Sequence, residues 1–86
     1  MTSASVVSRV TVADVLRLVG VVVPADPRRL VQCPLHDDRT PSMRVFPRGY
    51  VCYGCSQRGG LLDLVVALGL ADDRASAARY LEERFG

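Results

Sequence analysis

The stretch CPLHDDRTPSMRVFPRGYVCYGC, residues 33–55, contains all three cysteines and the single histidine of this 86-residue chain. The four residues form two pairs, Cys33-x2-His36 and Cys52-x2-Cys55. Such spacing places two ligands on one tight turn, or knuckle, and two knuckles complete a tetrahedron around a metal ion. Three thiolates and one imidazole are a common structural zinc set. We therefore predict one structural Zn2+ ion bound by Cys33, His36, Cys52 and Cys55.

Other interpretations of these four residues are less favourable. An odd number of cysteines excludes a complete set of internal disulfides. An iron–sulfur cluster with three Cys ligands and one His, or buried cysteines beside an unrelated histidine, would also fit the composition. Both spacings, using every Cys and His in the chain, favour zinc. Four protein ligands leave no open coordination position, so we expect a structural metal and no catalytic residue.

The length and composition indicate one small globular domain. A chain of this length buries only about 60% of its unfolded surface, so its core is marginal and a metal would add needed stability. The apolar fraction of 49% argues against disorder. The net charge of +2 is weak, but all eleven basic residues are arginine, which binds phosphate through a planar fork. An Arg-rich, Lys-free composition also fits a GC-rich genome.

The N-terminal half predicts one helix followed by two short strands. Residues 1–10 are Ser-rich and unpatterned, and we expect them to be frayed, with a single domain over 11–86. A helix is predicted over residues 11–20, because Thr11 and Asp14 form a capping box. The predicted inward face and helix end are Val12, Val15, Leu16 and Val19, followed by Gly20. Short strands are expected at 21–23, before Pro24, and at 29–33.

The C-terminal half predicts a hairpin followed by two helices, which makes the fold class small α+β. Residues 42–46 and 50–53 alternate as two strands joined by a turn, and residues 57–60 break the chain. A buried helix should then end at Gly69. A last amphipathic helix should begin after Asp72 or Asp73. Its predicted inward residues are Ala75, Ala78, Leu81 and Phe85.

The segments CPLHDDRTPSMRV, YVCYGC and RGGLLDLVVALGL resemble the zinc-binding domain at the N-terminus of bacterial and phage replicative DNA primases, often called the CHC2 zinc finger. The resemblance extends from about residue 10 to residue 80. It implies a zinc ribbon, in which a small antiparallel sheet carries two metal knuckles and is flanked by helices. Three positions depart from the family pattern: Leu35 and Met43 replace Phe, and Ser56 replaces Gly. We expect Ser56 to affect the turn or the binding surface.

The resemblance also implies contact with single-stranded template DNA. If Met43 and Val45 face the core, alternation along residues 42–46 presents Arg44 and Phe46 outward. The alternative, which the sequence favours slightly for Phe46, is that this ring packs in the core. Arginine beside aromatic rings on a sheet is a usual platform for single strands. Thr40 and its neighbours should order the loop after the first knuckle, with a secondary contact to phosphate. The complete predicted set is Arg39, Thr40, Arg44, Phe46, Arg48, Tyr53 and Arg58.

The function expected from the sequence is a primase-like zinc module that binds single-stranded DNA in replication and lacks its own catalytic domain. Its expected partners are a primase catalytic subunit, a helicase or a polymerase. An alternative is a zinc-ribbon interaction module that docks on a replication or transcription enzyme, as a phage or mobile-element regulator would. Charged Asp14 and Arg17 interrupt the N-terminal apolar run, so it is not a signal peptide, and no membrane segment is predicted. We expect a cytoplasmic protein.

Overall fold

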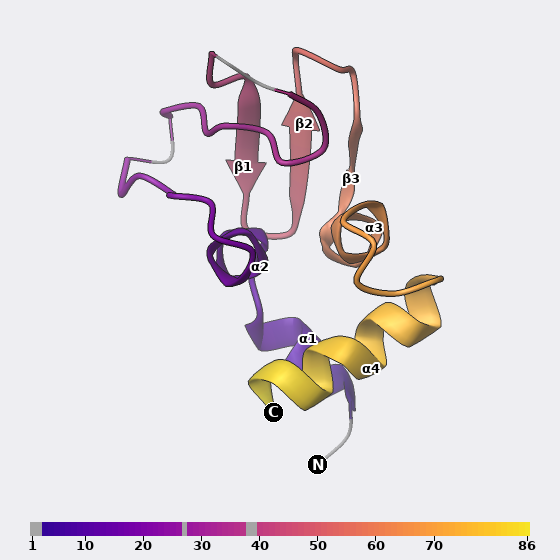
Figure 1. Cartoon of the computed structure of the whole chain (residues 1–86). Coiled ribbons are helices and arrows are strands. Elements are labelled where there is room, and N and C mark those ends of the chain that lie inside the picture. The colour runs from indigo at the N-terminus through magenta and orange to yellow at the C-terminus, as the bar shows by residue number, and fades with distance from the viewer. Residues whose placement is uncertain (1–2, 27, 38–39) are drawn as a thin grey trace.

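Seven short elements build the chain in the computed structural model, which describes residues 3–26, 28–37 and 40–86. The sheet lies at one end of the molecule, and α1 and α4 lie at the other, where both termini are found (Figure 1). Among the described residues, none of the helices has the length and apolar character needed to cross a membrane. The elements in chain order are α1 (Ser3–Arg9), α2 (Val12–Leu18), β1 (Met43–Phe46), β2 (Gly49–Cys52), β3 (Arg58–Gly60), α3 (Leu61–Ala67) and α4 (Arg74–Phe85).

The three strands form one antiparallel sheet in the order β1-β2-β3. Successive side chains of a strand point to opposite faces, so the burial alternates. Met43, Tyr50 and Cys52 are buried on the inner face, whereas Phe46 is 44% exposed on the outer face. The predicted hairpin is therefore confirmed, with Arg44 and Phe46 on the side away from the core.

Helix α2 forms as the sequence predicts. Thr11 accepts a hydrogen bond from the Asp14 backbone and Asp14 accepts one from the Thr11 backbone, at 3.2 and 3.0 Å, which satisfies two free N–H groups of the first turn. Val12, Val15 and Leu16 are fully buried. Val19 is not part of this inward face, because the helix ends at Leu18 and the chain turns away through Gly20, where φ is +88°.

Of the two C-terminal helices, α3 packs against β2 and β3, and α4 packs against α3 and α1. Leu61, Leu64 and Val65 of α3 are buried, and φ is +77° at Gly69 beyond its end. Asp73 caps α4 by accepting a hydrogen bond from the Ser76 N–H at 2.8 Å. The buried residues of α4 are Ala77 and Leu81, so the inward face is rotated from the predicted one. The reason is that α4 packs against both α1 and α3; Ala75 is consequently exposed, and Ala78 and Phe85 are half-buried.

Residues 3–9 form helix α1, so the prediction of a frayed N-terminal stretch is wrong for these residues. Val6 and Val10 are buried, and α1 packs beside α4 (Figure 1). The first ten residues are too few, and their apolar positions too sparse, for the sequence to predict an amphipathic helix there. The burial of Val6 and Val10 depends on a helix some seventy positions later in the chain, which local sequence reasoning does not include.

The strands also differ from the predicted ones. Residues 21–23 have no regular structure, and the expected strand at 29–33 is reduced to one bridge between Val31 and Met43. The predicted break at 57–60 instead contains β3, whose Gly59 and Gly60 pair with Tyr50 and Gly49. A Cβ on Gly49 would lie 2.9 Å from the Gly59 carbonyl oxygen, so the glycines there allow close strand pairing.

The β1–β2 turn connects the sheet to three helices. The Pro47 carbonyl accepts a hydrogen bond from the Val12 N–H at the start of α2, and the Arg48 carbonyl accepts one from the Leu61 N–H at the start of α3, both at 3.1 Å. The Arg48 guanidinium donates to the carbonyls of Val7 and Val10 at 2.8 and 2.9 Å. These carbonyls lie at the C-terminal end of α1, where helix acceptors lack internal partners.

We predict that Arg48→Ala lowers the free energy of unfolding by about 1–3 kcal/mol, because two charge-assisted hydrogen bonds and the attachment of α1 are lost. Urea or thermal unfolding of the zinc-loaded protein measures this change. Arg84→Ala, which removes an equal charge from α4, should change stability by less than about 0.5 kcal/mol. Equal effects of the two variants would contradict the structural role assigned to Arg48.

Candidate metal centre

The first knuckle is held beside β1 by a single strand bridge. Val31 exchanges backbone hydrogen bonds with Met43 at 2.9 and 3.0 Å, and its carbonyl also accepts from the Ser42 N–H at 3.1 Å. This contact fixes the chain two residues before Cys33, whose side chain is buried. The turn that follows brings His36 back toward the sheet.

The second knuckle continues directly from β2. The Cys52 N–H donates to the Gln57 carbonyl at 2.7 Å, which closes the turn containing Cys55. Gly54 has no room for a side chain: a Cβ there would lie 2.7 Å from Ser42 Oγ and 3.1 Å from His36 Cε1. The glycine therefore allows the two knuckles to approach each other.

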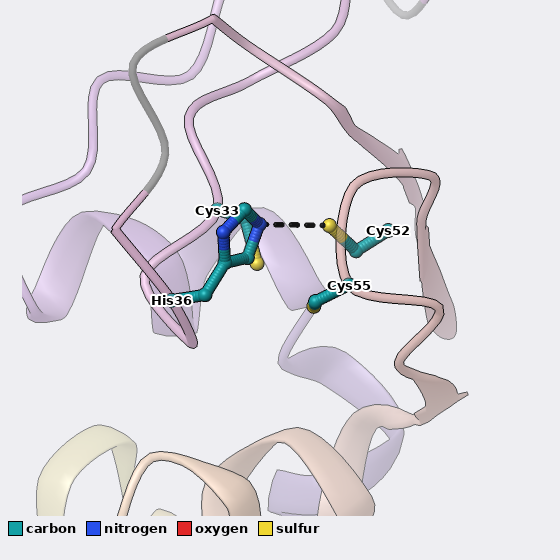
Figure 2. Close-up of side chains that lie close together, drawn as sticks. All are labelled: Cys33, His36, Cys52 and Cys55. Atoms are coloured by element: carbon teal, nitrogen blue, oxygen red, sulfur yellow. Dashed lines mark hydrogen bonds between the residues drawn. The ribbon is translucent and has the colours of Figure 1, made fainter.

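The four predicted ligands converge on one point (Figure 2). Their ligand atoms all lie within 4.8 Å of one another, and His36 Nε2 is 3.3 Å from Cys52 Sγ. Zinc–sulfur and zinc–nitrogen bond lengths imply tetrahedral edges of about 3.5–3.8 Å. The donor set and its spacing thus fit one structural zinc ion with only a slight closure of the cluster.

Ser42, the residue directly before β1, contacts one of the four ligands. Its hydroxyl oxygen lies 3.4 Å from Cys52 Sγ, and its carbonyl accepts from the Tyr53 N–H at 2.9 Å. The sequence predicts that Thr40 and its neighbours order this loop, but it does not indicate that Ser42 contacts a metal ligand. That contact links residues ten positions apart through strand pairing, and the sequence around Ser42 contains no separate signal for it.

The surroundings shift the thiol pKa values in opposite directions. Burial, followed by the nearby Cys52 and Cys55, raises the pKa of Cys33 to about 12. Burial also opposes ionisation of Cys52, but hydrogen bonds from the Ser42 hydroxyl, backbone N–H groups and His36 stabilise its thiolate and lower its pKa to about 6. Cys52 thus ionises more readily than Cys33. Binding of a divalent metal would displace the Cys33 proton and offset the repulsion among neighbouring thiolates.

The outer face of the sheet brings together two of the predicted DNA-contacting arginines. Arg44 pairs with Val51, and Val51 pairs with Arg58, so the three side chains form one row across the sheet. The Arg44 guanidinium carbon lies 5.5 Å from the centre of the Phe46 ring. We call Arg44, Phe46, Val51 and Arg58 the outer-face platform.

The remaining predicted DNA contacts lie elsewhere or have other partners. Tyr53 is 65% exposed beyond the end of β2. Thr40 is exposed in the loop before β1. Arg48 donates to α1 carbonyls at the opposite end of the hairpin, so its guanidinium has a structural role that sequence reasoning did not anticipate. Arg39 lies outside the described residues.

Comparison with known proteins identifies related sequences for most of the chain. The family model of the CHC2 zinc finger matches residues 3–84. Two curated DNA primases, from Chlamydia trachomatis serovar D and Chlamydia muridarum, are each 47% identical over 36 residues. The match covers 40% of this chain and 6% of each primase, so the chain corresponds to a small part of those relatives. No solved structure matches.

We predict that removing zinc abolishes the cooperative folding of this chain. Structural zinc contributes about 10–16 kcal/mol in zinc-finger peptides, which equals or exceeds the stability of a typical domain. Thermal melts followed by circular dichroism, with and without a chelator, test this prediction. Metal analysis should give one zinc per chain, and re-added zinc, but not magnesium, should restore the transition. An unchanged melt of the metal-free chain would contradict a structural role.

Two substitutions in the second knuckle should have opposite effects. Ser56 has φ +63°, the single positive value for a non-glycine residue in the part of the chain that the structure describes. Ser56→Gly should relieve this strain and stabilise the protein by about 0.5–1 kcal/mol.

Gly54→Ala should weaken zinc binding about tenfold or more, because its Cβ collides with Ser42 and His36. Competition with a fluorescent zinc chelator and thermal melts measure both effects; a stabilising Gly54→Ala would refute the packing described here.

Proposed function

The chain belongs to the CHC2 zinc finger family, and from this premise we propose that it is a zinc-stabilised module that binds single-stranded DNA during replication. It acts together with a primase catalytic unit, a helicase or a polymerase, and the zinc module itself supplies DNA binding. Its place is the cytoplasm, where reduced cysteines bind metal. The observation that carries the proposal is the outer-face platform.

The geometry of the platform suits a single strand. Directly opposite residues in neighbouring strands have Cβ atoms about 4.5–5.5 Å apart, so Arg44 and Arg58 lie on either side of Val51 at about twice that distance. Their guanidiniums suit successive phosphates, and the exposed Phe46 ring suits a base. Phe46 pairs with Gly49, and Gly49 pairs with Gly60. Because neither glycine has a side chain, the space beside the Phe46 ring is open.

Zinc would support this platform without contacting DNA. Cys52 ends β2 and lies on the inner face, one residue from Val51 on the outer face. Because the knuckle fixes the end of β2, it also fixes the position of Val51 between the two arginines. The metal would therefore act by holding Arg44, Val51 and Arg58 in fixed positions relative to one another.

A second candidate function is docking on a protein partner. Val22 is 86% exposed, and Val19 and Leu30 are also exposed in the same region. Val22 and Leu30 line a cleft of about 420 Å³ together with Pro34 and Pro41, close to the first knuckle. Exposed apolar patches of this kind often mark protein interaction sites. DNA binding by the platform and docking through this patch would use different surfaces.

The proposal is tested by fluorescence anisotropy of the zinc-loaded protein with single- and double-stranded oligonucleotides over a salt series. For single strands, log K should fall with log salt by about 0.7 per phosphate contact. We expect a slope equivalent to two to four contacts, about −1.4 to −2.8. The Arg44→Ala/Arg58→Ala double variant should reduce the slope by about 1.4.

The matched control is Arg79→Ala/Arg84→Ala, which removes the same charge from α4. This variant should keep the wild-type slope. An equal loss in both double variants would indicate nonspecific charge attraction and contradict the platform. No binding at low salt would overturn the DNA-binding function and favour the protein-docking candidate.

A further inference from the structure

We propose that the cleft beside the outer-face platform accepts one unstacked base of the bound single strand, with Arg17 and Arg29 contacting the flanking phosphates. This inference rests on the proposed function and adds a base-recognition site to it. The cleft lies between α2, β1 and the segments 23–26 and 29–31, and Phe46 is part of its wall.

The shape and lining of the cleft suit a flat aromatic ligand. Its volume is about 270 Å³. Sites for drug-sized ligands measure about 300–1,000 Å³, so this cleft suits something smaller, such as a single base. Ala13, Val23, Pro24, Val45 and Pro47 supply an apolar surface. Apolar walls and an aromatic edge are the environment in which proteins hold an extruded base.

The charged groups of the cleft favour a nucleotide over an uncharged apolar ligand. Arg17 and Arg29 line it together with one carboxylate, Asp26. Arg17 is only weakly held, by an exposed ion pair with Asp14 at 3.7 Å. Asp26 already accepts from the Arg28 N–H at 3.0 Å and lies 3.6 Å from Arg28 Nε. The rim is therefore net positive, which suits the phosphates on either side of an inserted base.

The cleft and the platform form one continuous surface through Phe46. Phe46 belongs to the outer-face platform and also lines the cleft, while the Arg44 guanidinium carbon lies 5.5 Å from the centre of its ring. A strand held by Arg44 and Arg58 would therefore pass the mouth of the cleft. The platform would bind backbone and stack a base, and the cleft would distinguish strands that carry bases from those that do not.

The test compares a short single strand with the same strand made entirely abasic. Ala13→Leu fills the cleft from α2 without changing charge. It should weaken binding of the base-bearing strand about 5- to 30-fold, in line with the loss of one stacked base, and leave binding of the abasic strand unchanged. Ala67→Leu, the same substitution at an exposed position at the end of α3, should bind both strands like the wild type.

The outcomes separate this inference from the function on which it rests. If Ala13→Leu binds both strands like the wild type while Arg44→Ala/Arg58→Ala loses both, the platform stands and the base site is refuted. If the wild type binds neither strand, both proposals fail. Zinc content of one per chain confirms that each variant is folded.

A second measurement needs no variant. Titration of the wild type with dAMP, dGMP, dCMP and dTMP should shift the NMR methyl signals of Val23 and Val45 and leave those of Leu81, in the core, unchanged. Deoxyribose 5-phosphate, which lacks a base, should cause no comparable methyl shift. Equal shifts with the sugar phosphate, or none with any nucleotide, would overturn the base site.

Discussion

The joining of two knuckles by one metal ion is the constraint on which the rest of this structure depends. Cys33 and His36 come from a segment attached to the sheet by one bridge, whereas Cys52 and Cys55 continue from β2. Helices of seven residues are too short to be stable alone, and the core is small. With zinc bound, the loop, the sheet and the buried inner face around Met43 and Tyr50 become one unit.

Local signals in the sequence predict the elements that depend on neighbouring residues. The capping box at Thr11 and Asp14, the alternation through Arg44 and Phe46, and the spacing of the four ligands all lead to features that the structure confirms. In each case the responsible residues lie within a few positions of one another, or the chemistry admits few alternatives. The zinc ribbon expected from the family resemblance is likewise what the structure contains.

Long-range contacts account for what the sequence did not predict. Helix α1 is stabilised because it packs against α4 and because Arg48 donates to the carbonyls of Val7 and Val10. The sequence alone does not predict whether an arginine at a hairpin turn contacts DNA or the carbonyls at a helix end. Strand β3 contains two glycines and resembles a break, yet their lack of side chains is what permits close pairing with β2.

The position of the chain ends has a practical consequence. The start of α1 and the end of α4 both lie at the helical end, away from the sheet and its knuckles (Figure 1). Anything joined to either end, whether a fluorescent label, a surface anchor or another protein domain, would extend from the side opposite the metal. A fusion at either the N-terminus or the C-terminus should therefore leave the sheet exposed. Two such modules could be linked in tandem without covering the sheet of either one.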